Sequence, residues 1–242
     1  MAGLIVWHEL FTTDVDAASR FYAELLDAEI ETQTVGDLEY PMLKKGDGNH
    51  CGFVHNPSGG QIPSLWYPYI HVDDVDASTA KAQQLGAQLI HGPQDVADML
   101  RFSVLGDPQH ATFGLLTSEG EAPKGVFAWD ELHATDVDAA ASFYGDLAGW
   151  TTAEFMEGYR IFNAGETGVG GLMKERSGSA GGYWLTYLHV EDIDGAVDRA
   201  MELGAGVILP TESMETIGRY AVLTDPPGAA FGLHQPPAET AG

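Results

Sequence analysis

Glutamate and histidine side chains stand two positions apart in a segment whose composition is typical of a β-strand. From Trp129 to His133 the order is Trp-Asp-Glu-Leu-His, which places Glu131 two residues before His133. Successive side chains of a strand point to opposite faces, so Trp129, Glu131 and His133 are predicted to share one face. A carboxylate beside an imidazole can exchange protons near neutral pH. The spacing therefore predicts a proton-transfer pair next to an aromatic ring.

An earlier segment carries the same pattern without the histidine. Trp7 and Glu9 repeat the tryptophan and the glutamate at the same spacing, and Phe11 stands in the place of the histidine. A phenylalanine can pack but cannot carry a proton. We therefore expect two unequal sites, with the chemistry in the second half of the chain.

Aromatic and imidazole groups alternate in a similar way at residues 65–72 and 185–190. Such a lining can stack on a flat ligand and still move a proton. The predicted ligand-binding residues are Trp7, Phe11, Tyr40, Tyr67, Tyr69, Trp129, Tyr159 and Tyr187. The predicted proton carriers are Glu9, His71, Glu131, His133 and His189.

These acid–base groups also have a structural interpretation, which the sequence leaves open. Glu9 and Glu131 could instead hold tyrosine hydroxyls or backbone amides in place. His71 and His189 immediately precede helix caps, so they could instead tie the end of a strand to the next turn.

The elements that would position these groups follow from an Asp-Val-Asp-Ala tetrapeptide. It occurs at residues 14–17, 74–77 and 136–139, and as Asp-Ile-Asp-Gly at 192–195. Each copy lies between strand-forming residues and a stretch with helical spacing, so its first Asp is predicted to be an N-cap and its second to lie in the first helical turn. A calcium loop would need Gly and Glu at its sixth and twelfth places, where the first copy has Ser19 and Leu25. The tetrapeptide therefore indicates helix capping.

The repeat interval of 56 to 62 residues divides the chain into four modules, each with one helix and about four strands. One helix per four strands predicts an α+β fold with curved sheets, whose concave faces are natural pockets. The polar link from Ser118 to Gly125 is typical of a domain boundary. We therefore predict two similar domains, at residues 1–118 and 119–242.

Four modules in this register resemble the vicinal oxygen chelate superfamily, which includes glyoxalase I, bleomycin-resistance proteins, fosfomycin-resistance enzymes and extradiol dioxygenases. The shared signs are a Phe-Tyr pair (21–22 and 143–144), a Leu-Gly-Ala helix stop (85–87 and 203–205), an Asp-Pro turn (107–108 and 225–226) and a Phe-Gly-Leu strand (113–115 and 231–233). The resemblance spans about Leu4 to His234. It implies four βαβββ modules in two glyoxalase-like domains with partly open barrel sheets, and often a divalent metal held by His and Glu.

The residues at the implied metal positions depart from that pattern. These positions fall on Trp7 and Trp129, Tyr67 and Leu185, Gly114 and Gly232, and Gly52 and Gly171. Trp, Leu and Gly side chains offer no atom that a divalent cation prefers, so no cofactor is expected there. An alternative is a displaced divalent metal held by Glu131, His133, His189 and His234.

The net charge of the chain limits the kinds of molecule that it is expected to bind. The chain has 36 acidic and 11 basic residues, a net charge of −25 that repels nucleic acids and anionic membranes. A single cysteine, Cys51, fits a reducing compartment, and no apolar run approaches the length of a membrane span. We expect a cytoplasmic protein, monomeric or homodimeric, with a small-molecule ligand.

Three functions are compatible with these residues. The first is metal-independent acid–base chemistry of a lyase or isomerase on a small carbonyl or aromatic compound. The second is the binding of a drug or metabolite without turnover, as in bleomycin-resistance proteins. The third is a metal-dependent glyoxalase or dioxygenase that uses the displaced site. The glutamates and histidines on aromatic strands favour the first.

Overall fold

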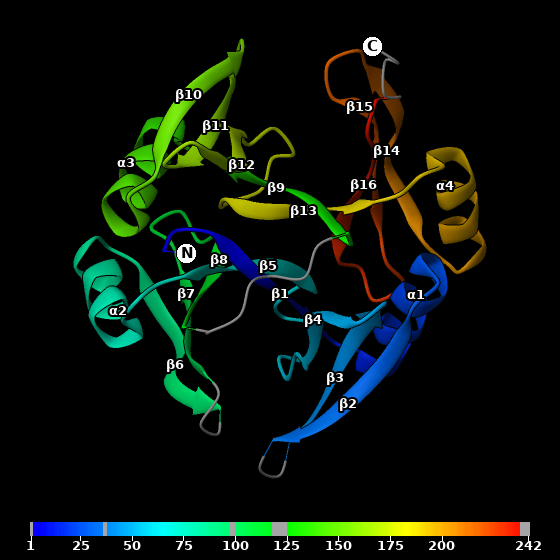
Figure 1. Ribbon diagram of the computed structural model, residues 1–242, viewed down its shortest axis with the longest axis horizontal. Helices are drawn as coiled ribbons and strands as arrows, with labels where there is room; N and C mark the ends of the chain where they lie inside the picture. Colours follow the sequence, from blue (N-terminus) through cyan, green and yellow to red (C-terminus); the bar gives the residue numbers. More distant parts are fainter. Residues whose placement is uncertain (1, 36–37, 97–99, 118–124, 238–242) are drawn as a thin grey trace. The chain divides into compact units, whose positions relative to one another are not determined.

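The computed structural model describes residues 2–35, 38–96, 100–117 and 125–237, in which the order strand, helix, strand, strand, strand occurs four times (Figure 1). Module 1 comprises β1 (Ile5–Thr12), α1 (Val15–Leu26), β2 (Glu29–Val35), β3 (Leu38–Lys45) and β4 (Gly48–His55). Module 2 comprises β5 (Leu65–His71), α2 (Val75–Gln84), β6 (Gln88–Val96), β7 (Leu100–Gly106) and β8 (Thr112–Thr117).

The second half repeats this order. Module 3 comprises β9 (Phe127–Ala134), α3 (Val137–Ala148), β10 (Thr151–Met156), β11 (Tyr159–Ala164) and β12 (Thr167–Lys174). Module 4 comprises β13 (Tyr183–His189), α4 (Ile193–Glu202), β14 (Gly206–Met214), β15 (Gly218–Thr224) and β16 (Ala230–Gln235). Each helix lies beside strands of its own module (Figure 1). Among the described residues, none of the helices has the length and apolar character needed to cross a membrane.

The strands form two eight-stranded sheets, in the orders β2-β3-β4-β1-β5-β8-β7-β6 and β10-β11-β12-β9-β13-β16-β15-β14. Within a module the first strand pairs in parallel with the last, and the other pairs are antiparallel. Glu9 therefore lies beside Gly52, and Glu131 beside Gly171. The predicted α+β fold of four βαβββ modules with curled sheets is confirmed.

The aspartates of the repeated tetrapeptide cap the helices, as predicted. Asp14, Asp74, Asp136 and Asp192 each accept a hydrogen bond from the backbone N–H three residues later, at 2.9, 2.9, 3.0 and 3.3 Å. A capping carboxylate satisfies a backbone donor that the first helical turn leaves free. The four helices therefore start at positions that the sequence specifies locally.

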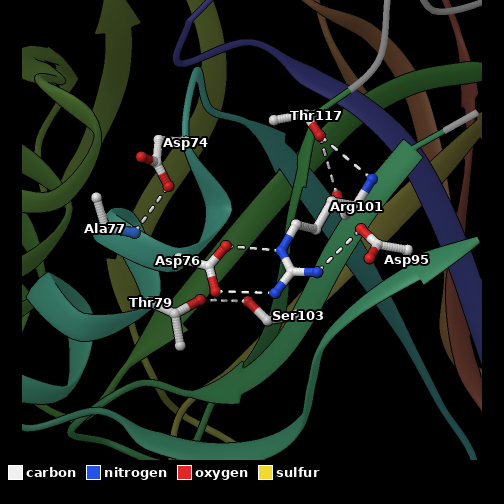
Figure 2. A network of polar contacts seen from close by, with 8 residues as sticks. All are labelled: Asp74, Asp76, Ala77, Thr79, Asp95, Arg101, Ser103 and Thr117. Carbon is white, nitrogen blue, oxygen red and sulfur yellow. Dashed lines mark hydrogen bonds and ion pairs between the residues drawn. The ribbon is translucent and has the colours of Figure 1, made fainter. Parts of the chain in front are cut away.

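The second aspartate of the tetrapeptide joins a helix to a strand in three modules. Figure 2 shows Asp76 of α2 accepting two bonds from the Arg101 guanidinium of β7, at 2.7 and 2.9 Å. Arg101 also donates to Asp95 on β6. Equivalent pairs join Asp138 with Arg160 and Asp194 with Arg219.

Tertiary contacts along the backbone group the modules into two compact units. The first unit comprises Met1–Trp7, Tyr67–Ala122 and Trp129–Leu185, and the second comprises His8–Trp66, Pro123–Ala128 and Thr186–Gly242. The core of the first unit is built around α2 and α3, and that of the second around α1 and α4. Residues 118–124, which include most of the predicted domain boundary, lie outside the described residues, so that boundary stays a prediction.

A buried hydrogen-bonded triad explains two of the sequence signs. In the first unit, Tyr144 Oη donates to Asp107 Oδ2 and accepts from Trp184 Nε1, both at 3.2 Å. Tyr144 belongs to a Phe-Tyr pair and Asp107 to an Asp-Pro turn, so the two motifs meet in one core. The second unit repeats the triad with Tyr22, Asp225 and Trp66.

Candidate functional site

Strand β9 directs alternate side chains to opposite faces of its sheet. Leu132 and Ala134 belong to the helix-covered core of the first unit. Trp129, Glu131 and His133 consequently lie on the other face. The strand therefore presents its carboxylate, imidazole and indole together, in the way that the alternation predicts.

Glu131 and His133 form a direct pair. Glu131 Oε1 lies 2.7 Å from His133 Nε2, and the two side chains are 11% and 13% exposed. A contact of this length is a strong hydrogen bond whose strength rises when the imidazole is charged. The pair is thus largely shielded by protein but still reached by solvent.

Tyr159 of β11 is a second hydrogen-bond partner of Glu131. Trp129 Nε1 donates to Tyr159 Oη at 2.8 Å, and the Tyr159 hydroxyl in turn donates to Glu131. Burial, reinforced by the nearby charge of Glu131, raises the pKa of Tyr159 well above its usual range. The phenol therefore keeps its proton at neutral pH and serves as a hydrogen-bond donor to the carboxylate.

Tyr183, which the sequence interpretation did not single out, contacts the other ring nitrogen of His133, Nδ1. Its ring stacks on His133 with centroids 4.6 Å apart and planes 11° from parallel, and its Oη lies 3.2 Å from His133 Nδ1. With Nε2 facing a carboxylate and Nδ1 facing a hydroxyl, the neutral imidazole carries its proton on Nε2. The alternation along β13 could have found this residue, because Tyr183 precedes Leu185 by two positions.

The equivalent positions of the first half repeat part of this arrangement. Tyr40 Oη donates to Glu9 Oε1 at 2.7 Å, which reproduces the tyrosine–glutamate contact of module 3. Phe11 stands in the place of the imidazole, and Leu65 in the place of Tyr183. The predicted inequality of the two sites is therefore present in their residues, and its functional meaning stays a prediction.

The remaining predicted residues occupy strand positions with mixed roles. Tyr67 and Tyr69 are buried on β5, with ring centroids 5.5 Å apart. The backbone of His71 binds Gly3 and Leu4, and the backbone N–H of His189 binds Val126, and these backbone bonds leave both interpretations of the two imidazoles open.

Tyr187 is buried, Trp7 is half-buried, and His234 Nε2 lies 2.6 Å from the Ile217 carbonyl oxygen. The ligand-binding and proton-transfer roles of these groups stay predictions.

The positions implied for the family's metal do not fit a metal in this chain. A Cβ atom on Gly171 would lie 1.9 Å from Tyr159 Oη, and one on Gly52 would lie 1.8 Å from Tyr40 Oη. At Gly114 and Gly232 the rings of Tyr69 and Tyr187 take up the same space, at 2.0 and 2.1 Å. A metal-binding side chain would collide with a tyrosine at each of these four glycines, and the indole of Trp129 has no ligand atom.

The alternative, displaced metal site would be formed by side chains outside these positions. In the described part of the chain, no three His, Cys, Asp or Glu side chains gather as metal ligands. The set of Glu131, His133, His189 and His234 therefore stays a prediction, to be tested by metal analysis.

A groove of about 450 Å³ lies elsewhere, in the second unit, at the start of α1. Its walls include Asp14, Asp16, Glu39, Tyr40 and His55. The Asp14 carboxylate accepts the capping hydrogen bond of α1. Of these wall residues, the sequence interpretation named only Tyr40 as a ligand contact.

The sequence profile described as "Glyoxalase-like domain" matches residues 6–116 and 127–234. The protein named "Putative glyoxylase CFP32" from Mycobacterium tuberculosis is 31% identical over 244 residues, covering 95% of this chain and 94% of that protein. "Anthracycline biosynthesis protein DnrV" from Streptomyces peucetius is 29% identical over 256 residues, covering 96% and 92%. The Mn(II)-bound glyoxalase from Novosphingobium aromaticivorans superposes with a TM-score of 0.68 at 13% identity, covering 97% and 82%, which is a likeness of fold.

Proposed function

Because this chain belongs to the glyoxalase-like domain family of the vicinal oxygen chelate superfamily, we propose that it is an enzyme that transfers protons on a small carbonyl or phenol compound without the metal of the superfamily. The observation that carries the proposal is the Glu131 carboxylate, 2.7 Å from His133 Nε2 on an aromatic sheet face. In this interpretation the Glu131–His133 pair takes the catalytic role that a metal ion has in metal-dependent members of the superfamily.

Glu131 is the proton carrier in this proposal. Its carboxylate takes a proton from a carbon next to the ligand's carbonyl group, the C–H electron pair moves into an enolate, and the protonated Glu131 then gives a proton to a second atom or to a leaving group. The product is an isomer, or an elimination product where a leaving group departs with the electron pair. A positioned acid–base group of this kind contributes about 10²–10⁴-fold to a rate.

The neighbours of Glu131 have supporting roles. Hydrogen bonds from His133 and Tyr159 orient the carboxylate, and the Trp129 indole holds the Tyr159 hydroxyl. The aromatic rings of Trp129 and Tyr183 supply flat surfaces on which an unsaturated ligand can stack.

Binding without turnover is the second candidate function. It is favoured by the aromatic character of the face, where the Tyr183 ring already stacks on an imidazole. The relative named for anthracycline biosynthesis suggests flat polycyclic compounds as the first ligands to test.

The test begins with a thermal-shift screen of aromatic and dicarbonyl compounds on chelator-treated protein. Ligands that stabilise the protein are then incubated with it in D₂O, and isomerisation, elimination or deuterium uptake is followed by NMR. We expect Glu131→Gln to keep the thermal shift and to lose turnover by about 10²–10⁴-fold.

Three outcomes would contradict the proposal. Turnover that persists in Glu131→Gln would remove the carboxylate from the mechanism. Turnover that appears only after a divalent metal is added back would favour the displaced metal site. A thermal shift without reaction in either protein would assign the chain to the binding class.

A further inference from the structure

The hydrogen bonds around Glu131 continue beyond His133 to the surface. The Tyr183 hydroxyl that contacts His133 Nδ1 also forms a hydrogen bond with the Ser177 side chain. Ser177 Oγ donates to the carboxylate of Glu175 while that carboxylate is ionised, so its single proton is directed to Tyr183 Oη only when Glu175 is protonated. Ser177 is exposed and Tyr183 is half-buried. An unbroken series of polar atoms therefore leads from the shielded glutamate to solvent.

The loop that carries Ser177 is held in place at both ends. The Glu175 carboxylate accepts bonds from the backbone N–H groups of Ser177 and Gly178, the latter at 3.2 Å. Gly178 has a φ of +83°, a conformation that other residues rarely adopt. At the far end, the Gly182 N–H donates to the Gln109 carbonyl oxygen at 2.6 Å. The loop thus keeps the serine hydroxyl next to Tyr183.

The internal repeat indicates that His133 and Tyr183 work together. Module 1 has Phe11 in the place of His133, and module 2 has Leu65 in the place of Tyr183. The tyrosine–glutamate contact itself is present in both halves, between Tyr40 and Glu9 in the first. The first half therefore lacks both polar groups at once, although it retains the glutamate.

We propose that His133, Tyr183 and Ser177 form a proton relay between Glu131 and solvent at Glu175. The inference rests on the proposed function, because a relay is useful only if Glu131 exchanges protons. It makes Tyr183 and Ser177 positioning residues that act through His133.

Each step of the relay moves one proton; the two hydroxyls end neutral, and the imidazole changes from the Nε2–H to the Nδ1–H tautomer until the reverse transfer restores it. When Glu175 takes a proton from water, it donates to Ser177 Oγ, the Ser177 proton passes to Tyr183 Oη, and the Tyr183 proton passes to His133 Nδ1. The imidazole then releases its Nε2 proton to Glu131. The net result is one proton moved from water to the Glu131 carboxylate, and the reverse sequence discharges it.

The test is NMR of the full chain with ¹⁵N-labelled histidine and no ligand. It measures the exchange of the His133 Nε2 proton with water and, from the two ring nitrogen shifts, the position of that proton. We expect the wild type to carry the proton on Nε2. Ser177→Ala should keep that tautomer, because Ser177 does not touch the ring, and should slow the exchange by about 10²-fold.

Tyr183→Phe should slow the exchange to a similar extent and also shift the Nδ1 resonance, because Nδ1 loses its donor. Tyr40→Phe is the matched control, since it removes the same hydroxyl from the Glu9 contact of the first half. It should leave the His133 resonances and their exchange unchanged. If Ser177→Ala exchanges at the wild-type rate, Tyr183 merely packs against His133 and the relay is wrong.

This experiment separates the relay from the proposed function. Slow exchange in both variants supports the relay even if no compound is ever turned over. Conversely, turnover that depends on Glu131 while exchange is normal in Ser177→Ala supports the proposed function and overturns the relay.

Discussion

At the scale of single residues, Glu9 and Glu131 occupy equivalent places and have different neighbours. Each accepts a bond from a tyrosine, Tyr40 or Tyr159, whose hydroxyl lies over a glycine. Glu131 also pairs with the imidazole of His133, and the first half has Phe11 at the position of that histidine. The two halves therefore differ at His133, where the first half has Phe11, and at Tyr183, where it has Leu65.

The first residue-scale prediction concerns His133→Phe, which copies the first half into the second. We expect turnover of any substrate found to fall by about 10²-fold or more, because Glu131 loses its proton partner. Phe11→Leu should leave turnover unchanged and cost at most about 1.5 kcal/mol of stability. Steady-state kinetics and chemical denaturation of both variants measure these effects. If only Phe11→Leu impairs turnover, the chemistry belongs to the first half.

The second residue-scale prediction concerns Gly171→Ala. The added Cβ would lie 1.9 Å from Tyr159 Oη and 3.0 Å from Trp129 Nε1, so the tyrosine must leave its place over the glycine. We expect a loss of about 1–3 kcal/mol in the free energy of unfolding, typical of overpacking. In a Tyr159→Ala background the same substitution should cost little, because the obstructing ring is gone. An equal cost in both backgrounds would show that the ring does not require the glycine.

At the scale of elements, capping was readable from the sequence and the ion pairs were not. The bond from the Ala77 N–H to Asp74 joins residues three apart, and the tetrapeptide specifies it. Asp76 and Arg101 lie 25 residues apart on a helix and a strand. Their meeting depends on how α2 packs on β7, which local composition does not encode.

The element-scale prediction compares these two aspartates of α2. Asp74→Ala should cost about 1 kcal/mol by removing the N-cap, with little dependence on salt. Asp76→Ala should cost at most about 1 kcal/mol, because both side chains of the Asp76–Arg101 pair are partly exposed to solvent. That loss should shrink in about 1 M salt, where charges are screened within about 3 Å. Chemical denaturation at low and high salt measures both, and a salt-independent loss for Asp76→Ala would contradict the ion-pair account.

At the scale of the whole molecule, the sequence repeat predicted the four modules. It did not predict which modules share a hydrophobic core. The four modules are so alike that the sequence does not reveal which helices share a core. The structure packs α1 with α4 and α2 with α3, and Tyr22 meets Asp225 across 203 residues of sequence. The alternation along β13 places Tyr183 on the face of Leu185, but its contact with His133 in another module is not visible in the sequence.

The last prediction follows from the buried carboxyl group of Asp225. Burial raises its pKa to about 6, although backbone N–H groups and Tyr22 partly oppose the shift. An unfolded aspartate titrates near about 3.9, so the folded state binds this proton more tightly than the unfolded state. The contribution of Asp225 is therefore most favourable below about pH 4, and it declines as the pH rises through about 6.

Asp225→Asn removes this titration while retaining a side-chain oxygen that can accept the Ala229 N–H. We expect the free energy of unfolding of the variant, relative to the wild type, to rise by about 2–3 kcal/mol between about pH 4 and 7. Asp107→Asn in the first unit is the matched comparison, because burial raises the pKa of that carboxyl as well. Urea denaturation across the pH range measures the free energy of unfolding of each variant and of the wild type. Subtracting the wild-type value cancels the titration of the acidic groups that both proteins share. A difference that stays constant with pH would show that Asp225 titrates normally and that the Tyr22–Asp225–Trp66 triad does not shield it.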